Sequence, residues 1–301
     1  EPGADVRNLD GVNVERVTAD VCDGAALSRV LSGAEAFYHL AAIYKLWLPD
    51  PSLIYRVNLE GTTACLLAAQ KAGVPRIVYT ASIAAVGLRP DGEPADETTA
   101  FNLHDIANEY ILTKHLSERT ALRFAEAGVP VVVVNPAFPF GERDAGPTPT
   151  GKILVDVVSG KAPGYTPGGI NVVDVDVVAE GHLLAEEKGR VGESYMICGD
   201  PHTLVEALDL AETVTGIPRP ASVPPILLRA MSGVMRVVEK GITPPEQFSA
   251  ENLRVIAGAT YIGSNARAKR ELGFAPRPLE EGLPEMLRHE MGLLGLEPKK
   301  R

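Results

Sequence analysis

The most constraining feature of this 301-residue chain is the run Val131-Val132-Val133-Val134. Successive side chains of a strand point to opposite faces, so four branched apolar residues in a row leave neither face suited to water. Strands of this kind lie inside parallel sheets that are covered by helices on both sides. The run therefore predicts an α/β fold in which strands and helices alternate along the chain.

Shorter apolar runs and amphipathic stretches alternate on either side of this run. Further strands are expected at Val12–Thr18, Ala36–Leu40, Arg76–Thr80, Ile170–Val173 and Tyr195–Cys198. Helices are expected from the capping residue Asp23 to about Leu31, over Ser52–Ala72, His104–Gly128 and Asp176–Glu187, near Gly151–Ser159, and over Leu279–Leu294. This order forms βαβ units and therefore a parallel sheet.

The composition is that of an ordinary globular protein, with 45% hydrophobic and 23% charged residues. The net charge of −10 disfavours a nucleic-acid partner. Cys22, Cys65 and Cys198 lie far apart and match no metal-binding spacing, so we expect buried, reduced thiols and no metal site. Together with the lack of a long apolar run or a signal peptide, these thiols predict a cytoplasmic protein without a membrane span.

Beyond Pro136 the alternation becomes irregular. Residues 137–169 are rich in proline and glycine, and helical patterns dominate from Pro201 onward. One of these patterns is an apolar stripe formed by Ile226, Leu227, Ala230, Met231, Val234, Met235 and Val238. We expect this stripe to pack in a core or a subunit interface rather than on a membrane surface, because its polar side lacks a lysine-rich face.

Tyr110 and Lys114 form a Y-x-x-x-K pattern within the helix expected over His104–Gly128. Residues four apart lie on the same face of a helix, so both side chains can point into one cleft. A free tyrosine loses its proton only near pH 10, and a nearby ammonium group lowers that pKa. A tyrosine tuned in this way can exchange a proton with a substrate oxygen. The pattern alone also occurs by chance on solvated helices, so its context decides.

Several further motifs supply that context in a fixed order. They are Asp20-Val21, Tyr38-His39-Leu40-Ala41-Ala42, Val57-Asn58-Leu59-Glu60-Gly61-Thr62, Thr80-Ala81-Ser82, Tyr110 to Lys114, and Asn135-Pro136. Together they resemble the extended short-chain dehydrogenase/reductase family, the group of sugar-nucleotide epimerases and dihydroflavonol reductases. Three stretches look like its hopanoid-associated sugar epimerase subfamily: residues 41–51, 88–92 and 147–151. Residues 264–274 match the C-terminal signature of the family.

The resemblance implies a Rossmann-type doubly wound parallel sheet with a smaller, mostly helical substrate lobe. Residues 1–138 and 170–199 would form the NAD(P)-binding domain, and residues 139–169 and 200–301 the substrate-binding lobe. Members of the family often dimerise through a bundle of helices, which here would include Ser52–Ala72 and His104–Gly128.

The resemblance also implies the catalytic roles. Tyr110 would be the acid/base. Lys114 would hold the nicotinamide ribose and lower the pKa of Tyr110. Ser82, just past a strand end, would form a hydrogen bond to the reacting oxygen, and its alternative role is that of a helix cap or turn serine.

A second set of residues would contact the cofactor, which is NADP or NAD, with family habit favouring NADP. These residues are Asp20 and Val21 at the adenine, Leu40, Ala41 and Ala42 at the pyrophosphate and ribose, Asn58, Thr80, Tyr110, Lys114, and Pro136 and Phe138 at the nicotinamide. The alternative for Leu40 is strand-end packing. Asn58 could instead be a buried amide that ties two strands together.

Other polar and aromatic residues have plainer explanations. His39 lies in an apolar strand and is expected to be a hydrogen-bonded core histidine. Tyr44, Lys45 and Trp47 follow a strand end, where they could line a substrate pocket or only pack in a loop.

The chain also departs from the family pattern, because it contains no G-x-x-G-x-x-G motif. The family carries this motif on its first strand-to-helix turn, where backbone N–H groups hold the pyrophosphate. We interpret the chain as lacking the family's first two strands, which would expose the edge of Ala36–Leu40. The 301 residues alone are then expected to be marginally stable and to bind nucleotide poorly. A cooperative melt together with tight NADPH binding would contradict this expectation.

These patterns together predict an NAD(P)-dependent oxidoreductase or epimerase. It would move a hydride at a hydroxyl- or carbonyl-bearing carbon of a small-molecule substrate, and the resemblance implies a sugar or polyol group attached to a hopanoid. The alternatives are a nucleotide-binding sensor or scaffold on the same fold, and an inactive fragment of the enzyme.

Overall fold

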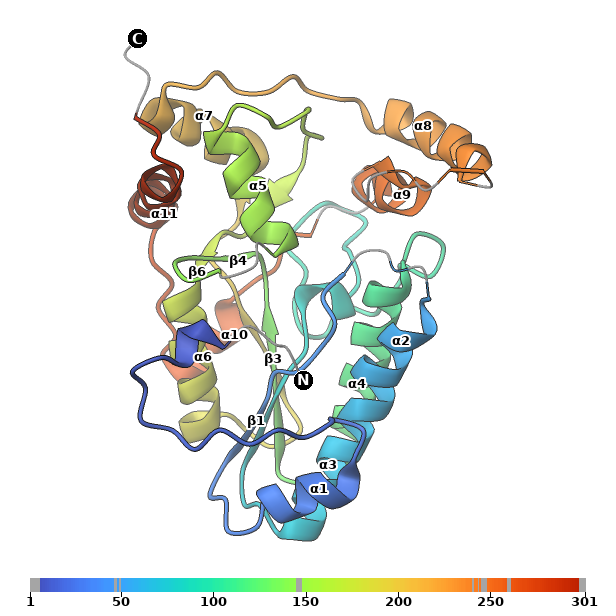
Figure 1. Cartoon of the computed structure of the whole chain (residues 1–301), viewed down its shortest axis with the longest axis vertical. Coiled ribbons are helices and arrows are strands. Elements are labelled where there is room, and N and C mark those ends of the chain that lie inside the picture. The colour runs from blue at the N-terminus through green and yellow to red at the C-terminus, as the bar shows by residue number, and fades with distance from the viewer. Residues whose placement is uncertain are drawn as a thin grey trace.

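A four-stranded parallel sheet lies at the centre of the protein (Figure 1). The computed structural model describes residues 6–45, 48, 50–144, 148–239, 241–242, 244, 248–258 and 261–297. The strand order is β1-β2-β3-β7, formed by Phe37–His39, Ile77–Thr80, Val131–Pro136 and Ser194–Ile197. All three pairings are parallel, which confirms the predicted α/β class.

Helices cover both faces of this sheet, as the valine run requires. Ile77, Tyr79, Val131 and Val133 pack with residues of α1 (Gly24–Val30), α3 (Thr62–Ala72) and α4 (Glu109–Glu126). Val78, Val132 and Val134 point the other way and pack with residues of α6 (Val175–Lys188) and α10 (Ala266–Leu272). All four valines of the run are fully buried, and each such burial stabilises the fold by about 1.5–3 kcal/mol.

The helix predicted over Ser52–Ala72 is one continuous helical run with an irregular centre. It consists of α2 (Ser52–Tyr55), a π-helical segment η2 (Arg56–Gly61) and α3, and it ends at Gly73, whose φ of 70° suits glycine. The π-helical segment contains Asn58, and such segments often occur at functional sites.

Side-chain caps set the first residues of two helices. Asp23 accepts hydrogen bonds from the backbone N–H groups of Ala25 and Ala26, which confirms its predicted capping role for α1. The helix predicted from His104 begins only at Glu109, because the Asn108 side chain caps it by accepting from the N–H of Ile111.

The strand predicted at Val12–Thr18 is wrong. This described segment is irregular, and the side chains of Val12, Val14 and Val17 are about half exposed. Its apolar alternation is typical of a strand, but a strand also needs a neighbour that accepts its hydrogen bonds. β1 is an edge of the sheet and pairs only with β2 among the described strands.

The strand predicted at Ile170–Val173 is divided between two small sheets. β5 (Gly169–Ile170) pairs antiparallel with β8 (His202–Thr203), and β6 (Val173–Asp174) pairs parallel with β4 (Pro139–Phe140). The buried Asn171 between them donates hydrogen bonds to the carbonyls of Gly199 and Gly263.

A second apolar core lies beside the sheet. It is built from residues of β4, α5 (Pro149–Val158), α7 (Leu204–Thr215) and α11 (Leu279–Leu293). α5 and α11 lie where helices were predicted. At the upper right of Figure 1, α8 (Pro225–Val238) packs against α9 (Ala250–Gly258), and α8 is the outer of the two.

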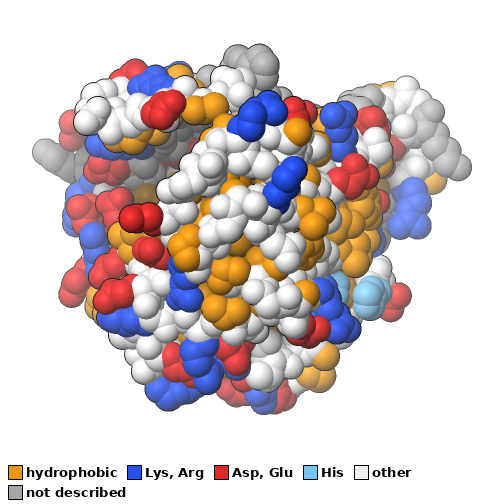
Figure 2. All heavy atoms as spheres, turned by 90° about the horizontal axis from the view of Figure 1, so that it is seen from below, with side chains coloured by type: hydrophobic (Ala, Val, Ile, Leu, Met, Phe, Trp, Pro, Cys, Tyr) orange, Lys and Arg blue, Asp and Glu red, His pale blue; other side chains and the backbone are white. Residues whose placement is uncertain are grey.

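The apolar stripe of α8 does not pack in the core of this chain. Ser232 is the one buried side chain of this described helix, and the stripe residues point mainly to the solvent. Core packing, as predicted, is therefore wrong for α8 within one chain. Elsewhere, on the lower face where α1 lies, apolar side chains gather among interspersed acidic and basic ones (Figure 2).

Candidate active site

Three predicted catalytic residues meet at the carboxyl ends of the strands. Ser82 lies two residues beyond β2, and α4 carries Tyr110 and Lys114. The Tyr110 hydroxyl lies 3.5 Å from Ser82 Oγ, at the limit of a hydrogen bond. Ligands of open parallel sheets bind at this end of the strands, so the fold places these side chains where a substrate can reach them.

Ser82 has the capping role considered from the sequence, and its position also suits the predicted catalytic role. Its Oγ accepts a hydrogen bond of 3.2 Å from the N–H of Ala84 and thereby caps η3 (Ile83–Ala85). The same oxygen faces the Tyr110 hydroxyl. The cap holds the serine rotamer, which leaves the hydroxyl proton of Ser82 available to a substrate oxygen.

Lys114 is buried with its ammonium group against the strand end. Its Nζ donates a 2.8 Å hydrogen bond to the carbonyl of Thr80 and lies 5.6 Å from the centre of the Tyr79 ring. Burial lowers the pKa of Lys114 to about 8, while the nearby Glu118 carboxylate acts in the opposite direction. Lys114 is thus mostly charged at neutral pH.

The environment of Tyr110 favours its protonated form. Burial is the main cause that raises the pKa of Tyr110, and Tyr44, whose ring centre lies 5.0 Å away, adds to it. The resemblance predicts that Lys114 lowers this pKa, but burial has the larger effect in this structure. A protonated tyrosine beside a serine hydroxyl is suited to donate a proton to a carbonyl oxygen.

The sequence interpretation missed Glu118, which continues the helix face of Tyr110 and Lys114. The buried Glu118 carboxylate accepts hydrogen bonds from Asn135 Nδ2 at 3.1 Å and from Ser194 Oγ at 2.9 Å. Asn135 Nδ2 also donates to the Ser82 carbonyl at 3.0 Å. Glu118 is therefore linked through one amide to the segment that carries Ser82. The i, i+4, i+8 spacing is the signal that could have identified it.

Tyr261 is a second residue that sequence reasoning missed. It lies far along the chain, yet it packs against the apolar clusters that contain Tyr110 on one side and Ala137 and Phe138 on the other. Its buried hydroxyl has no hydrogen-bond partner among the residues that the structure describes. A buried hydroxyl without a partner is unfavourable, which marks Tyr261 as a candidate ligand contact.

The residues predicted at the adenine end are accessible. Asp20 is exposed, and the N–H of Cys22, which donates to its Oδ1 at 2.8 Å, lowers the pKa of this carboxyl group. The side chain of Leu40 is 57% exposed and Ala41 is also exposed. Strand-end packing, the alternative for Leu40, is therefore wrong. Val21 packs in the apolar cluster with residues of α3, and a Cβ on Gly61 at the end of η2 would lie 2.8 Å from Val21 Cγ2.

Asn58 uses its whole amide within the protein. Its Oδ1 accepts from the N–H of Ile43 at 2.7 Å, and its Nδ2 donates to the carbonyl of Ile43 and to Thr113 Oγ1, both at 3.1 Å. The buried-amide alternative thus describes its geometry, except that Asn58 ties the loop after β1 to α4 rather than joining two strands. This tie holds the loop with Ala41 and Ala42 against the catalytic helix.

At the nicotinamide end, the strand ends of β2 and β3 carry the predicted residues. Thr80 Oγ1 is hydrogen-bonded to His182 Nε2 at 2.9 Å, and its carbonyl accepts from Lys114. Pro136 ends β3 and is partly buried. Phe138 has a φ of 45°, which is unfavourable for a bulky residue and is often found at functional sites.

Among the remaining sequence interpretations, His39 is a buried core histidine whose Nε2 is hydrogen-bonded to Thr62 Oγ1, as predicted. Cys65 and Cys198 are buried free thiols, whereas Cys22 is partly exposed. Tyr44 packs on Tyr110. Trp47 lies outside the described residues, as do parts of residues 41–51 and 147–151.

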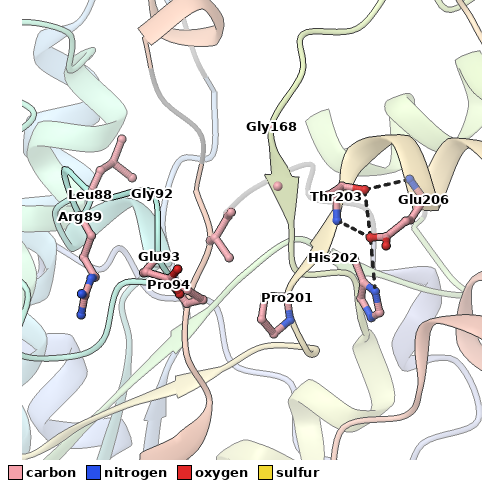
Figure 3. A pocket seen from close by; sticks show the side chains of 12 residues that line it. Leu88, Arg89, Gly92, Glu93, Pro94, Gly168, Pro201, His202, Thr203 and Glu206 are labelled. Atoms are coloured by element: carbon pink, nitrogen blue, oxygen red, sulfur yellow. Dashed lines mark hydrogen bonds and ion pairs between the residues drawn. The ribbon is translucent and has the colours of Figure 1, made fainter.

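A cleft of about 720 Å³ lies beside this site (Figure 3). Its wall is formed on one side by Leu88, Arg89, Gly92, Glu93 and Pro94, and on the other by Gly168, Pro201, His202, Thr203 and Glu206; Gly169 and Ile262 also line it. Consecutive side chains of an extended segment point to opposite sides. Ile262 lines the cleft, whereas its neighbour Tyr261 packs towards Tyr110. The chemistry therefore belongs on the Tyr261 side.

Chemical groups that could contact a nicotinamide dinucleotide are present at both of its predicted ends. The Asp20 carboxylate can accept from an adenine amino group, and the exposed Ala41 lets a ligand approach the backbone. Lys114 can donate from its buried ammonium group to ribose hydroxyls. The parallel sheet and the Ser82–Tyr110–Lys114 cluster define the class of nicotinamide-dependent oxidoreductases and epimerases.

Comparisons with known proteins agree. The chain belongs to the NAD dependent epimerase/dehydratase family, whose model matches residues 3–198. It is 33% identical to a dihydroflavonol 4-reductase-like protein of Synechocystis sp., over 92% of this chain and 82% of the relative. It is 32% identical to sterol demethylase protein B of Methylococcus capsulatus, over 91% and 84%. The crystal structure of gox2253 shares 36% identity and a TM-score of 0.85, over 98% of this chain and 90% of that one.

Proposed function

We propose that the protein is an NAD(P)-dependent oxidoreductase or epimerase that acts on a hydroxyl- or carbonyl-bearing carbon of a sugar or polyol group carried by an isoprenoid lipid such as a hopanoid. The observation that carries this proposal is the approach of the Tyr110 hydroxyl to Ser82 Oγ, with Lys114 one turn away on the same helix. Family membership supports the redox chemistry.

The proposed mechanism gives each side chain one task. A nicotinamide held by Lys114 and the neighbouring strand ends would supply or take up the hydride. In reduction, the protonated Tyr110 donates its proton to the carbonyl oxygen, while the Ser82 hydroxyl donates a hydrogen bond to the same oxygen. The charged Lys114 then stabilises the phenolate that remains. In oxidation the same groups act in reverse, and an epimerase would use both directions in one cycle.

The substrate class rests on two supports. The sequence resembles the hopanoid-associated epimerases at residues 41–51, 88–92 and 147–151. One relative is named for a sterol, which is also a polycyclic isoprenoid. The aromatic rings of Tyr44 and Tyr261 beside Tyr110 are suited to pack against the substrate, and the Tyr261 hydroxyl is free to hydrogen-bond to it.

Within this proposal NADP is the preferred cofactor, residues 139–169 and 200–301 form the substrate lobe, and a helix bundle forms a homodimer.

Replacing Tyr110 with phenylalanine tests the proposal. The enzyme should lose turnover by about 10²–10⁴-fold, because the proton donor is gone, and it should keep its affinity for the cofactor. A nucleotide sensor or scaffold would show no turnover to lose. Tyr38→Phe is the matched control, because the Tyr38 hydroxyl donates a 2.9 Å hydrogen bond to Glu186 on α6 and belongs to neither the catalytic cluster nor the proposed substrate lobe. Equal turnover in the Tyr110→Phe variant and the wild type would refute the assignment.

A further inference from the structure

The outer face of α8 is the most exposed apolar surface of any helix that the structure describes. Ile226, Val234 and Val237 are 76%, 64% and 68% exposed. Their spacings of eight and three residues place them on one side of the helix, together with Ala230. Leu227, Met231 and Val238 of the same helix are also exposed.

The opposite side of α8 is occupied by α9. Ser232 Oγ donates a 2.6 Å hydrogen bond to the carbonyl of Ala250, and Glu239 Oε1 accepts a 2.7 Å hydrogen bond from the N–H of the same residue. These bonds fix the rotation of α8 about its axis. The apolar side is therefore held away from the protein by polar contacts, and it is not exposed through loose packing.

Charges around this face have a clear asymmetry. The acidic side chains of this helix pair are used inside it, Glu239 by Ala250 and Glu251 by Arg254 at 3.6 Å. Arg229 and Arg236 are exposed; Arg229 donates a 3.3 Å hydrogen bond to the carbonyl of Ala257 on α9, and none of the described acidic side chains forms an ion pair with Arg236. In a chain with a net charge of −10, the apolar side of α8 thus has exposed arginines at its edge.

The helix pair is also connected to the catalytic helix. Val255 of α9 packs in the cluster that contains Tyr110. Arg254 donates hydrogen bonds of 2.9 Å and 3.2 Å to the carbonyls of Asp105 and Ala107, just before α4. α8 lies beyond α9 as seen from the sheet (Figure 1). A surface bound to α8 would therefore be connected through α9 to the Tyr110 cluster and to the segment before α4.

We propose that the outer face of α8 docks the protein on a bilayer that contains anionic lipid. The apolar side chains would enter the boundary between headgroups and acyl chains, and the long side chains of Arg229 and Arg236 would reach the phosphates. This inference rests on the proposed function, because an isoprenoid-lipid substrate resides in a membrane and must be taken from it. The sequence predicted no membrane contact because the polar side of the stripe lacks lysines. Exposed arginines can supply the positive charge that anionic lipid requires.

Vesicle flotation tests the docking. The full chain should float with vesicles of phosphatidylcholine and phosphatidylglycerol, and less with phosphatidylcholine alone. The double variant Ile226→Asp/Val234→Asp should lower the bound fraction tenfold or more, because two apolar side chains that would enter the bilayer become charged. Arg236→Glu should weaken binding only to the anionic vesicles. The control is Leu183→Asp, since Leu183 is 58% exposed on α6, on the other side of the sheet.

The following outcomes decide between the interpretations. The docking face is supported if the double variant loses flotation while the Leu183→Asp control keeps it, and if the double variant turns over a short water-soluble substrate as the wild type does. Wild-type protein that does not float, or a double variant that floats as well as wild type, overturns it. A wild-type dimer that the double variant converts to a monomer, without flotation, shows that a second copy covers the face, which also overturns it. If the protein turns over a detergent-dispersed lipid but does not float, the docking is rejected and the proposed function stands. If the protein floats but does not turn over the lipid, the docking face is supported and the proposed substrate is rejected.

Discussion

Replacing Glu118 with glutamine should change how the stability of the protein depends on pH. Burial raises the pKa of the Glu118 carboxyl group to about 7, although hydrogen bonds from Ser194 and Asn135 act in the opposite direction. The charged or titratable groups that face it are Lys114, Arg119 and Tyr79. Glutamine has nearly the same shape and does not titrate, so the variant isolates this one ionisation.

The magnitude follows from the two pKa values. The unfolded carboxyl group ionises near its usual value of 4.5 and the folded one near 7, so between these values the folded state binds more protons. The stabilisation that Glu118 contributes is present below pH 4.5 and is lost as the pH rises through 7. One pKa unit corresponds to about 1.36 kcal/mol, and the whole change therefore amounts to about 3 kcal/mol.

Urea unfolding of the wild type and of Glu118→Gln at pH 5 and pH 8 measures this change. The free energy of unfolding of the wild type minus that of the variant should fall by about 2–3 kcal/mol between the two pH values. Glu126→Gln serves as the control, because Glu126 is exposed at the end of the same helix and should show no such change. If the Glu118 difference is the same at both pH values, or grows with pH, the assignment of a raised pKa is wrong.

Three further variants test the site. Lys114→Met should lower kcat by at least about tenfold. The kcat of the wild type should fall as the pH rises through about 8, because Lys114 loses its proton there, and this fall should be absent from the pH–kcat profile of the variant. A variant profile with the same fall contradicts the role of Lys114. Asn58→Leu should lower the free energy of unfolding by about 2–5 kcal/mol in urea titrations, because the N–H and carbonyl of Ile43 lose their partner; a loss below about 1 kcal/mol would show that the amide is not a structural tie. Tyr261→Phe should leave the free energy of unfolding within about 0.5 kcal/mol of wild type, since the hydroxyl has no partner among the described residues. The same variant should raise KM for the substrate. An unchanged KM removes Tyr261 from the substrate site.

Much of the fold could be predicted because its signals are local. The valine run at 131–134 required burial on both faces, and both faces are covered by helices. Asp23 and Gly73 set helix ends through their own chemistry, and the structure has both ends where the sequence placed them. The approach of Tyr110 and Lys114 followed from helix geometry alone. In each case the deciding interaction lies within a few residues of the chain.

Two of the errors have a different cause, which lies outside the segment itself. Val12–Thr18 has the alternation of a strand, but pairing is decided by a neighbour that the segment itself does not contain. Residues 170–173 pair with two different partners, and no local pattern distinguishes this from one continuous strand. The helix start predicted at His104 is too early, because Asn108 caps the helix. This cap decides the start more strongly than the apolar periodicity around it.

The same distinction holds for the site. The sequence by itself determined which residue types face one another along α4, because a helix repeats every few residues. Only the tertiary structure decided that Glu118 is joined through Asn135 to the Ser82 segment, that Tyr261 lies beside Tyr110, and that the apolar side of α8 faces the solvent. Periodicity says which face of an element is apolar. What covers that face depends on distant segments, whose positions are set by the packing of the whole chain.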